Sequence, residues 1–438
     1  MNKKKYVNRN YLTTTRIIAL GFLITVIVGT ILLSLPIASA NGTWTDLLTA
    51  AFTSTTSVCV TGLVVVDTFS YWSLFGKGVI LILIQIGGLG IVSIITLFML
   101  LFRMKITLKS TMLLQDAFNL NSKQGLLKFT IKVIKGTFLI EGIGAFIYSF
   151  YYCREYGLLK GIWFSVFHAV SAFCNAGLDI MGADSLIPYH SNLLMMLNTS
   201  FLIIMGGIGF IVWWDTVEAF RRIRTKKCSI RSAWNGVHLQ TKIAIFMTLL
   251  LLIGGTVVIY FLERSNPDTL GNLSEKDRIL NAFFQSVTLR TAGFAAVPQA
   301  ALRPVTAFFG ALLMMIGGSP VGTAGGMKTV TIAVIFFTFA AMIRNHEDTE
   351  VFKRNIPVSV VKKAVAIVFL SMSTIFIMTI LLMATNDVNL LDALFEVASA
   401  VCTVGLSRNL TPVLNTAGQI IIMICMYIGR VGPISMVV

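Results

Sequence analysis

A thirteen-residue motif occurs four times in this 438-residue chain, at nearly equal intervals. Aligned on a glycine, the copies read AFTSTTSVCVTGL (51–63), VFHAVSAFCNAGL (166–178), AFFQSVTLRTAGF (282–294) and LFEVASAVCTVGL (394–406). Each copy has a phenylalanine ten residues before the glycine, and the glycines (Gly62, Gly177, Gly293 and Gly405) are 115, 116 and 112 residues apart. A repeat of this regularity predicts a fold of four equivalent units that bury their apolar faces against one another.

The sequence between the copies is that of an integral membrane protein. Hydrophobic residues make up 56% of the chain and charged residues 12%, about half the charged fraction of a soluble domain, which is roughly 25%. Segments long enough to span a bilayer are expected at 17–38, 74–102, 131–152, 193–214, 240–262, 305–343, 359–384 and 417–438. The six cysteines include no CxxC pair, so neither a disulfide framework nor a transition-metal site is predicted.

The distribution of basic residues predicts the orientation. Of the 35 lysines and arginines, 24 lie in the segments 1–16, 103–135, 221–242 and 344–363. With eight spans these segments share one side, which the positive-inside rule assigns to the cytoplasm together with both termini. The net charge of +16 therefore reflects topology and contact with anionic lipid, and nucleic-acid binding is not expected.

A second glycine feature follows each copy of the motif. GGLG (87–90), GGIG (206–209), GGSP (317–320) and GRVG (429–432) begin 24 to 29 residues after the motif glycine, inside the next apolar segment. Each unit therefore reads as a span, a half-length helix, a glycine-ended polar loop and a second span. The predicted fold class is an all-α membrane protein with eight transmembrane helices and four re-entrant pore helices around one pore.

The polar loops are the candidate site. Non-helical backbone is tolerated at membrane depth where it is buried in protein or lines a wet cavity, and glycine allows carbonyl groups to point inward and replace the water shell of an ion. A selectivity filter is therefore predicted at Val60, Thr61, Gly62, Asn175, Ala176, Gly177, Thr291, Ala292, Gly293, Thr403, Val404 and Gly405. Hydroxyls that could anchor loop to helix belong to Thr55, Thr56, Ser57, Ser171, Ser286, Thr288 and Ser399. The alternative is a set of small-residue faces for helix packing.

The fourfold pattern with TGL, NAGL, TAGF and TVGL resembles the Ktr/Trk/HKT superfamily of potassium transporters. TLRTAGF, SPVGTAGGMKT and the GRVG of the last span are most similar to KtrB, the membrane subunit of bacterial Ktr systems. The resemblance covers residues 15 to 438 and implies one pore per chain, a homodimer in the bacterial cytoplasmic membrane, and a cytosolic KtrA-like regulatory ring that binds nucleotide. Glycine at all four filter positions favours K⁺ in this superfamily; stimulation by Na⁺ is left open, and no cofactor is expected on the chain itself.

The resemblance also implies an intramembrane gate. SPVGTAGGMKT (319–329) interrupts an apolar segment with small residues that do not sustain a straight helix, so a loop beneath the filter or a packed helix kink is expected. A phosphate-binding loop is excluded because Met327 stands at the position of its last glycine. Arg430, midway along the last span, pairs inside the bundle or faces the pore below the filter. The predicted gate residues are Gly317, Gly318, Ser319, Gly322, Thr323, Ala324, Gly325, Gly326, Lys328 and Arg430.

Other residues near the loops are interpreted as scaffold. Arg290, beside the third filter loop, is expected to point back to the carbonyls that end its pore helix. Cys59, Cys174 and Cys402 occupy the same position in three copies, and packing is favoured over metal binding. His168 is expected to pack, and Glu141 relays protons or is a hydrogen-bonded buried acid.

The predicted units are bounded as follows: N-terminus 1–16, repeat 1 at 17–102 with pore loop 46–66, an interfacial segment 103–130, repeat 2 at 131–220 with pore loop 161–181, a basic loop 221–239, repeat 3 at 240–343 with pore loop 278–297 and gate loop 317–329, a loop 344–358, and repeat 4 at 359–438 with pore loop 390–409. The interfacial segment contacts lipid or docks the regulatory ring.

The sequence therefore predicts regulated potassium uptake. The alternative is a secondary carrier of sodium or a small solute; carriers also contain broken helices but usually show two-fold repeats. An enzyme is not expected, because HExxH and GxSxG are absent and intramembrane acids and histidines are few.

Overall fold

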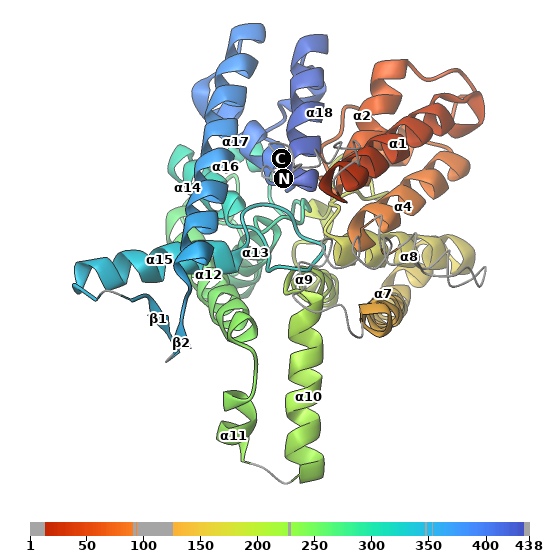
Figure 1. Ribbon diagram of the computed structural model, residues 1–438. Helices are drawn as coiled ribbons and strands as arrows, with labels where there is room; N and C mark the ends of the chain where they lie inside the picture. Colours follow the sequence, from red (N-terminus) through yellow and green to blue (C-terminus); the bar gives the residue numbers. More distant parts are fainter. Residues whose placement is uncertain are drawn as a thin grey trace, which may run out of the picture.

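The computed structural model describes residues 14–90, 93, 126–226, 229–346, 348–352 and 354–432. Within these residues the fold is helical, except for one antiparallel pair of two-residue strands, β1 (Glu350–Val351) and β2 (Arg354–Asn355). The four repeats follow one another around a common centre in Figure 1, from α1, α2 and α4 through α7, α8 and α9 to α16, α17 and α18. The predicted helical fold, with its repeats arranged around one centre, is therefore confirmed.

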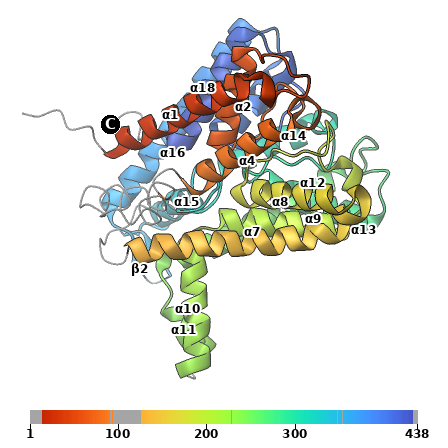
Figure 2. The ribbon, with the colours of Figure 1, turned by 90° about the vertical axis from the view of Figure 1, so that its right-hand side faces the viewer.

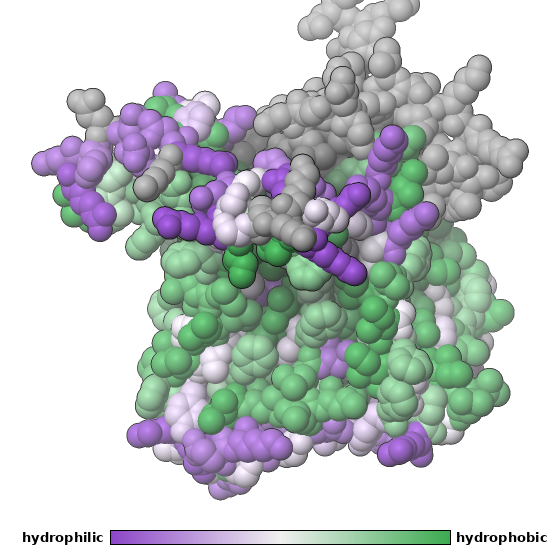
Figure 3. Space-filling model, turned by 90° about the horizontal axis from the view of Figure 1, so that it is seen from below, coloured by the Kyte–Doolittle hydropathy of each residue, from purple (hydrophilic) through white to green (hydrophobic). Residues whose placement is uncertain are grey.

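Each repeat begins with a long apolar helix. These helices are α1 (Thr14–Ser34), α7 (Leu126–Tyr156), α12 (Leu239–Glu263) and α16 (Val358–Thr385), and each is long and apolar enough to cross a bilayer. Large apolar side chains on them face outward, among them Ile24, Phe146, Ile253 and Phe369. Figure 3 shows apolar residues over much of one face of the molecule, between hydrophilic residues at two opposite edges. This distribution is that of a multi-pass membrane protein.

A shorter helix follows in each repeat and is buried near the centre. These helices are α2 (Leu47–Cys59), α8 (Leu158–Cys174), α13 (Glu275–Thr288) and α17 (Leu390–Val401). Three begin at a side-chain N-cap, for example Asp46, which accepts hydrogen bonds from the amides of Leu48 and Thr49. The motif phenylalanines anchor the short helices in the core: Phe52, Phe167 and Phe395 are fully buried, and Phe283 is partly buried.

The next helix of each repeat ends in the middle of the predicted second span. α4 (Leu74–Leu89), α9 (Leu193–Gly207), α14 (Pro304–Met315) and α18 (Thr416–Val431) all end at or within two residues of the second glycine feature. Gly90, Gly209 and Gly432 have positive φ values of 80°, 95° and 93°, a backbone conformation that ends a right-handed helix and favours glycine.

One predicted span is corrected by this break. The segment 193–214 is not a single helix, because α9 and α10 (Phe210–Lys226) meet at 97°. The cause lies in tertiary packing: the carbonyls of Gly206 and Gly207 accept hydrogen bonds from Thr323 and Ser319, and the Phe210 amide donates to Val321. Figure 2 shows α10 and α11 (Ile230–Asn235) projecting perpendicular to α7.

The segment between α14 and α15 (Thr329–Ile343) contains no helix. We call residues 317–328 the crossing loop. Its ends are joined by backbone hydrogen bonds from Gly317 to Met327 (2.9 Å) and from Met327 to Met315 (3.2 Å). The smaller elements are α3 (Thr68–Tyr71) and four 3₁₀ turns at 36–38, 187–189, 299–301 and 411–413. The predicted interfacial segment lies outside the described residues as far as residue 125.

Candidate functional site

The four motif glycines meet in a closed ring at the centre of the molecule. A Cβ atom placed on Gly62 would lie 2.6 Å from the carbonyl oxygen of Ala176, one on Gly177 would lie 2.6 Å from that of Ala292, and one on Gly293 would lie 2.6 Å from that of Val404. A Cβ on Gly405 would meet the carbonyl of Thr61 and close the ring. Each glycine therefore faces the carbonyl that precedes the next glycine, and no larger residue fits without displacing backbone.

The residues before the ring are bent in the same way in every repeat. We call 60–62, 175–177, 291–293 and 403–405 the glycine loops. Their first residues, Val60, Asn175, Thr291 and Thr403, are all left-handed, with φ of 55°, 60°, 67° and 51°. The ring glycines also have positive φ, between 64° and 102°. The backbone conformation is thus repeated at all four positions although the side chains differ.

Three hydroxyls in the glycine loops have no internal partner. The buried side-chain oxygens of Thr61, Thr291 and Thr403 make no hydrogen bond within the described part of the chain. A buried polar atom without a partner is costly, and the lone pairs of a hydroxyl oxygen can also coordinate a cation. The loops therefore combine unpartnered oxygens with closely approaching carbonyls, a donor set suited to a hard cation such as K⁺ or Na⁺.

Hydroxyls from the short helices hold the glycine loops in place. Thr56 and Ser399 accept hydrogen bonds from the amides of Gly62 (2.9 Å) and Gly405 (3.0 Å). Ser171 and Thr288 instead donate to the carbonyls of Leu178 (2.5 Å) and Phe294 (2.7 Å) just after the glycines. Four of the seven predicted anchoring hydroxyls are therefore confirmed as anchors.

The other three hydroxyls bond elsewhere. Thr55 and Ser57 donate to carbonyls of their own helix, at Ala51 and Thr53, and Ser286 donates to carbonyls of α12. None of these hydrogen bonds reaches a glycine loop.

The expectation for Arg290 is wrong. Its guanidinium does not return to the end of α13 but donates to the carbonyl of Gly317, at 3.4 Å, in the crossing loop. Arg290 is buried, and α13 ends at Thr288, five residues before its glycine, whereas α2 and α8 end three residues before theirs. The early end releases Arg290 from helical geometry, so its side chain extends toward the loop.

The crossing loop lies against the ring. The Thr323 hydroxyl donates to the carbonyl of Phe173 at the end of α8 (3.1 Å), and a Cβ on Gly325 would lie 2.9 Å from the carbonyl of Cys402. Ser319 and Thr329 join their hydroxyls at 2.9 Å. The small residues of SPVGTAGGMKT are therefore needed because backbone packs directly on backbone.

Two basic residues are tied to the crossing loop through carbonyl groups. Arg430 donates to Thr323 (2.6 Å) and also to the carbonyls of Gly87 and Gly88, while Lys328 donates to Ala324 (2.6 Å). Arg430 therefore pairs with carbonyls inside the bundle, one of which belongs to the crossing loop, and its position facing the pore stays a prediction. The structure thus brings the predicted gate residues together around the loop and Arg430.

A cavity of about 340 Å³ opens on the ring, and its lining includes all four ring glycines. We call it the vestibule. Its charged lining residues are Asp67 and Asp179. Neither aspartate was identified from the sequence, although both closely follow a ring glycine.

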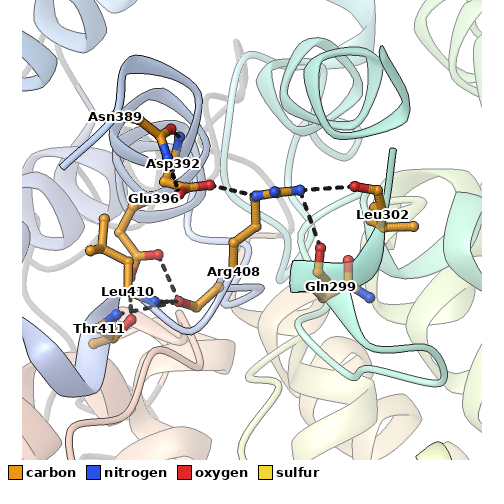
Figure 4. Close-up of polar contacts among 9 residues, drawn as sticks. Gln299, Leu302, Asn389, Asp392, Glu396, Arg408, Leu410 and Thr411 are labelled. Atoms are coloured by element: carbon orange, nitrogen blue, oxygen red, sulfur yellow. Dashed lines mark hydrogen bonds and ion pairs between the residues drawn. The ribbon is translucent and has the colours of Figure 1, made fainter. Parts of the chain in front are cut away.

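One wall of the vestibule is held by the polar cluster of Figure 4. Ser407, which lines the vestibule, donates to the buried carboxylate of Glu396 (2.7 Å), and Thr411 donates to the same carboxylate. Arg408 forms an ion pair with Asp392, at 2.6 Å. These contacts fix the segment after the fourth glycine loop.

The remaining candidates lie behind the glycine loops. Cys59, Cys174 and Cys402 are buried free thiols, and the described residues contain no group of three potential metal-binding side chains. Glu141 accepts a hydrogen bond from Gln85 (3.2 Å). His168 packs against aromatic rings, including that of Phe294. The packing prediction for His168 is confirmed, and Glu141 has the contacts of a hydrogen-bonded buried acid.

The chain resembles known cation transporters over its whole length. Residues 3–438 match the family model TrkH, described as cation transport protein. The potassium/sodium uptake protein NtpJ of Enterococcus hirae is 38% identical over 98% of this chain and 93% of its own length. The Ktr system potassium uptake protein B of Bacillus subtilis is 37% identical over 100% and 95%. The potassium transporter TrkH from Vibrio parahaemolyticus shares the fold, with a TM-score of 0.72 and 17% identity over 100% of this chain and 86% of that chain.

Proposed function

Because this chain belongs to the TrkH family of cation transport proteins, we propose that it takes up potassium across the cytoplasmic membrane through one central pore. The observation that carries the proposal is the closed ring of Gly62, Gly177, Gly293 and Gly405. Curated relatives named as potassium uptake proteins support K⁺ as the transported ion. Transport, rather than catalysis, is also what the family name describes.

In this proposal the glycine loops form the selectivity filter. Backbone carbonyls of the residues before the ring glycines replace the water shell of K⁺, and K⁺ is the cargo of the protein, not a resident cofactor. The unpartnered hydroxyls of Thr61, Thr291 and Thr403 complete the oxygen lining. The four short helices direct their negative C-terminal ends toward the same centre, which favours a cation there.

The crossing loop is the proposed gate. It packs beneath the ring against Phe173 and Cys402, on the side away from the vestibule. Arg430 holds it to α4 through Gly87 and Gly88, and adds a positive charge below the filter. An ion passes only when the loop backbone moves away, so a change in the Arg430 or Lys328 contacts alters the rate of uptake.

The eight-span arrangement with four re-entrant pore helices and cytoplasmic termini completes the proposal, since the four basic segments share one side in it. The resemblance to Ktr system proteins further supports a homodimer and a cytosolic nucleotide-binding KtrA-like ring as partners. In this orientation the crossing loop faces the cytoplasm and the vestibule opens outside the cell.

Sodium is the second candidate. A relative named potassium/sodium uptake protein favours either transport of Na⁺ or stimulation by it. Hard oxygen ligands bind both ions, and the choice depends on cavity size and on the number and field of the carbonyls.

Growth of a potassium-uptake-deficient bacterium expressing the chain tests the proposal. We expect rescue at low external potassium, and comparison of media with and without sodium separates stimulation by Na⁺ from independence of it. Potassium uptake is measured directly in the same cells, with the Gly177→Ala variant as a non-transporting control. An expressed, membrane-localised chain that neither rescues growth nor takes up potassium under either condition would contradict the proposal.

A further inference from the structure

The vestibule carries negative charge without a lining cation. Asp67 and Asp179 line it, and among the residues that the structure describes no lysine or arginine does. Within the described residues neither aspartate forms an ion pair: Asp67 accepts hydrogen bonds from Phe69 and Ser70, and Asp179 accepts them from the Met181 amide and the Ser185 side chain. The cavity on one side of the glycine ring is therefore anionic.

Arg408 is the basic residue closest in sequence to the vestibule wall, because it lies between the lining residues Ser407 and Asn409. Its side chain is turned away from the cavity. Figure 4 shows the guanidinium directed to the Asp392 carboxylate and to the carbonyls of Gln299 (3.4 Å) and Leu302 (3.3 Å).

The Asp392 contact is partly buried. The Arg408 side chain is 13% exposed and that of Asp392 is 26% exposed, so this pair is less screened than a surface pair. Asp392 is itself oriented by Asn389, whose amide donates to its second oxygen at 2.6 Å. The ion pair and the two carbonyls together neutralise and hold the one arginine adjacent to the wall.

Lys77 is the other cation near the aspartates, and its ammonium lies 5.0 Å from the centre of the Phe69 ring. It is not a lining residue, and it partly offsets the charge of Asp67.

We propose that the vestibule concentrates monovalent cations in front of the glycine ring, and that Asp392 acts as a positioning residue that keeps the Arg408 charge out of it. A cleft of one charge sign with low-dielectric walls raises the local concentration of the opposite ion. The inference rests on the proposed function, since it concerns the entry of the ion that the filter selects. It assigns Asp67, Asp179, Asp392 and Arg408 to the apparent affinity for external potassium rather than to the maximal rate.

Initial rates of potassium uptake, measured in cells against external potassium at low ionic strength, test the proposal. Asp179→Asn and Asp392→Asn are each expected to raise the half-saturating potassium concentration about two- to fivefold, and Asp67→Asn somewhat less. Maximal uptake remains near that of the parent. Adding N-methylglucamine chloride is expected to reduce these differences, because the screening length falls from about 30 Å at 0.01 M to about 8 Å at 0.15 M.

The double variant Asp392→Asn/Arg408→Gln distinguishes charge from structure. Removal of the released positive charge is expected to restore the half-saturating concentration of Asp392→Asn to near the parent value. Asp46→Asn is the matched control, because Asp46 caps α2, does not line the vestibule, and asparagine retains the cap.

Two results would overturn the inference. The first is an unchanged half-saturating concentration in Asp67→Asn/Asp179→Asn at low ionic strength with maximal uptake intact. The second is a double variant that is no better than Asp392→Asn, which would assign the ion pair to folding of the wall alone. Loss of uptake at saturating potassium in the parent chain would instead contradict the proposed function.

Discussion

The third repeat differs from the other three where its short helix meets the glycine ring. In repeats 1, 2 and 4 the amide of the residue before the ring glycine bonds the carbonyl five residues earlier, as Thr61 does with Thr56, Ala176 with Ser171 and Val404 with Ser399. In repeat 3 the amide of Ala292 reaches only four residues back, to Thr288. The third short helix therefore ends with a different turn, although its glycine occupies the same place in the ring.

The second glycine feature shows the same division. In repeats 1, 2 and 4 its first glycine (Gly87, Gly206 or Gly429) packs on the carbonyl four residues before the ring glycine, at Val58, Phe173 or Val401. In repeat 3 the corresponding Gly317 packs on Gly325 within the crossing loop. In repeat 3 the second glycine feature therefore contacts the crossing loop, where in the other repeats it contacts the end of a short helix.

These two differences indicate that the glycine ring forms even though the third repeat supports its ring glycine with other contacts than repeats 1, 2 and 4. The contacts within the ring involve only the ring glycines and the carbonyls that precede them. The residues that pack behind a glycine loop can therefore differ between repeats. Repeat 3 uses that freedom to connect a glycine loop, through Arg290 and Gly317, to the proposed gate.

The largest effect is expected from substitution of the ring glycines, which tests whether the four repeats are equivalent at the ring. Gly177→Ala and Gly293→Ala each place a methyl group about 2.6 Å from a backbone carbonyl, as the two ideal Cβ positions show, at a φ that alanine rarely adopts. Such overpacking costs about 1–3 kcal/mol or more, and about 1.4 kcal/mol corresponds to tenfold. We expect both variants to reduce potassium uptake at least about tenfold.

Gly142→Ala is the matched control, because a Cβ at this α7 position meets no atom within 4 Å. Wild-type uptake and selectivity in Gly293→Ala, alongside a defective Gly177→Ala, would mean that the third glycine does not belong to the ring.

The next effect concerns the crossing loop, which is confined to repeat 3. Deletion of residues 322–326 removes its contacts to Phe173 and to Arg430, and we expect potassium flux to rise several-fold and to become less dependent on the regulatory partner. Arg430→Ala is expected to act in the same direction with a smaller effect, and Arg430→Lys to retain more control. Unchanged flux in a correctly folded deletion variant, judged by size-exclusion chromatography, would contradict a gating role.

A smaller effect is expected from the second glycines, and it differs in kind between the repeats. Gly87→Ala and Gly429→Ala press a methyl group on the carbonyl end of a short helix, so we expect a change in the ratio of potassium to sodium uptake. Gly317→Ala presses on the crossing loop and is expected to change flux with selectivity preserved. Identical changes in flux and selectivity in all three variants would contradict a separate role for the second glycine of repeat 3. Gly254→Ala is the control, because a Cβ at this position meets nothing within 4 Å.

The smallest effect is expected from the hydroxyl anchors. Thr56→Val and Ser399→Ala leave the buried amides of Gly62 and Gly405 without their acceptor, at a cost of about 1–3 kcal/mol each. We expect lower thermal stability in detergent and a modest loss of selectivity for potassium over sodium. The third repeat has Val287 at the corresponding position, so Val287→Ala should leave selectivity unchanged; a loss as large as that of Ser399→Ala would show that packing, not the hydroxyl, is responsible.

Local patterns in the sequence were enough to locate the short helices and their ends. The same left-handed conformation is adopted by the first residue of every glycine loop, namely Val60, Asn175, Thr291 and Thr403. Each of these loops follows a short helix, and the sequence repeat alone indicates that the four loops are equivalent. The hydroxyls of Thr56, Ser171, Thr288 and Ser399 could likewise be proposed as anchors, since they lie six or seven residues from the groups that they bond. Short-range geometry of this kind depends little on the rest of the fold.

Composition and the fourfold period were sufficient to predict the membrane class, the four units and the approach of the four motif glycines, and an interruption was predicted in the segment 305–343 alone. Only the tertiary structure decided the partner of Arg290, the 97° break between α9 and α10, the carbonyls held by Arg430, and the vestibule with Asp67 and Asp179. Most of these features join segments far apart in the chain: the Arg430 contacts, for example, connect residues 107 and 343 positions away. No local spacing encodes which buried carbonyl a long basic side chain will reach, because that depends on how separate repeats pack against each other.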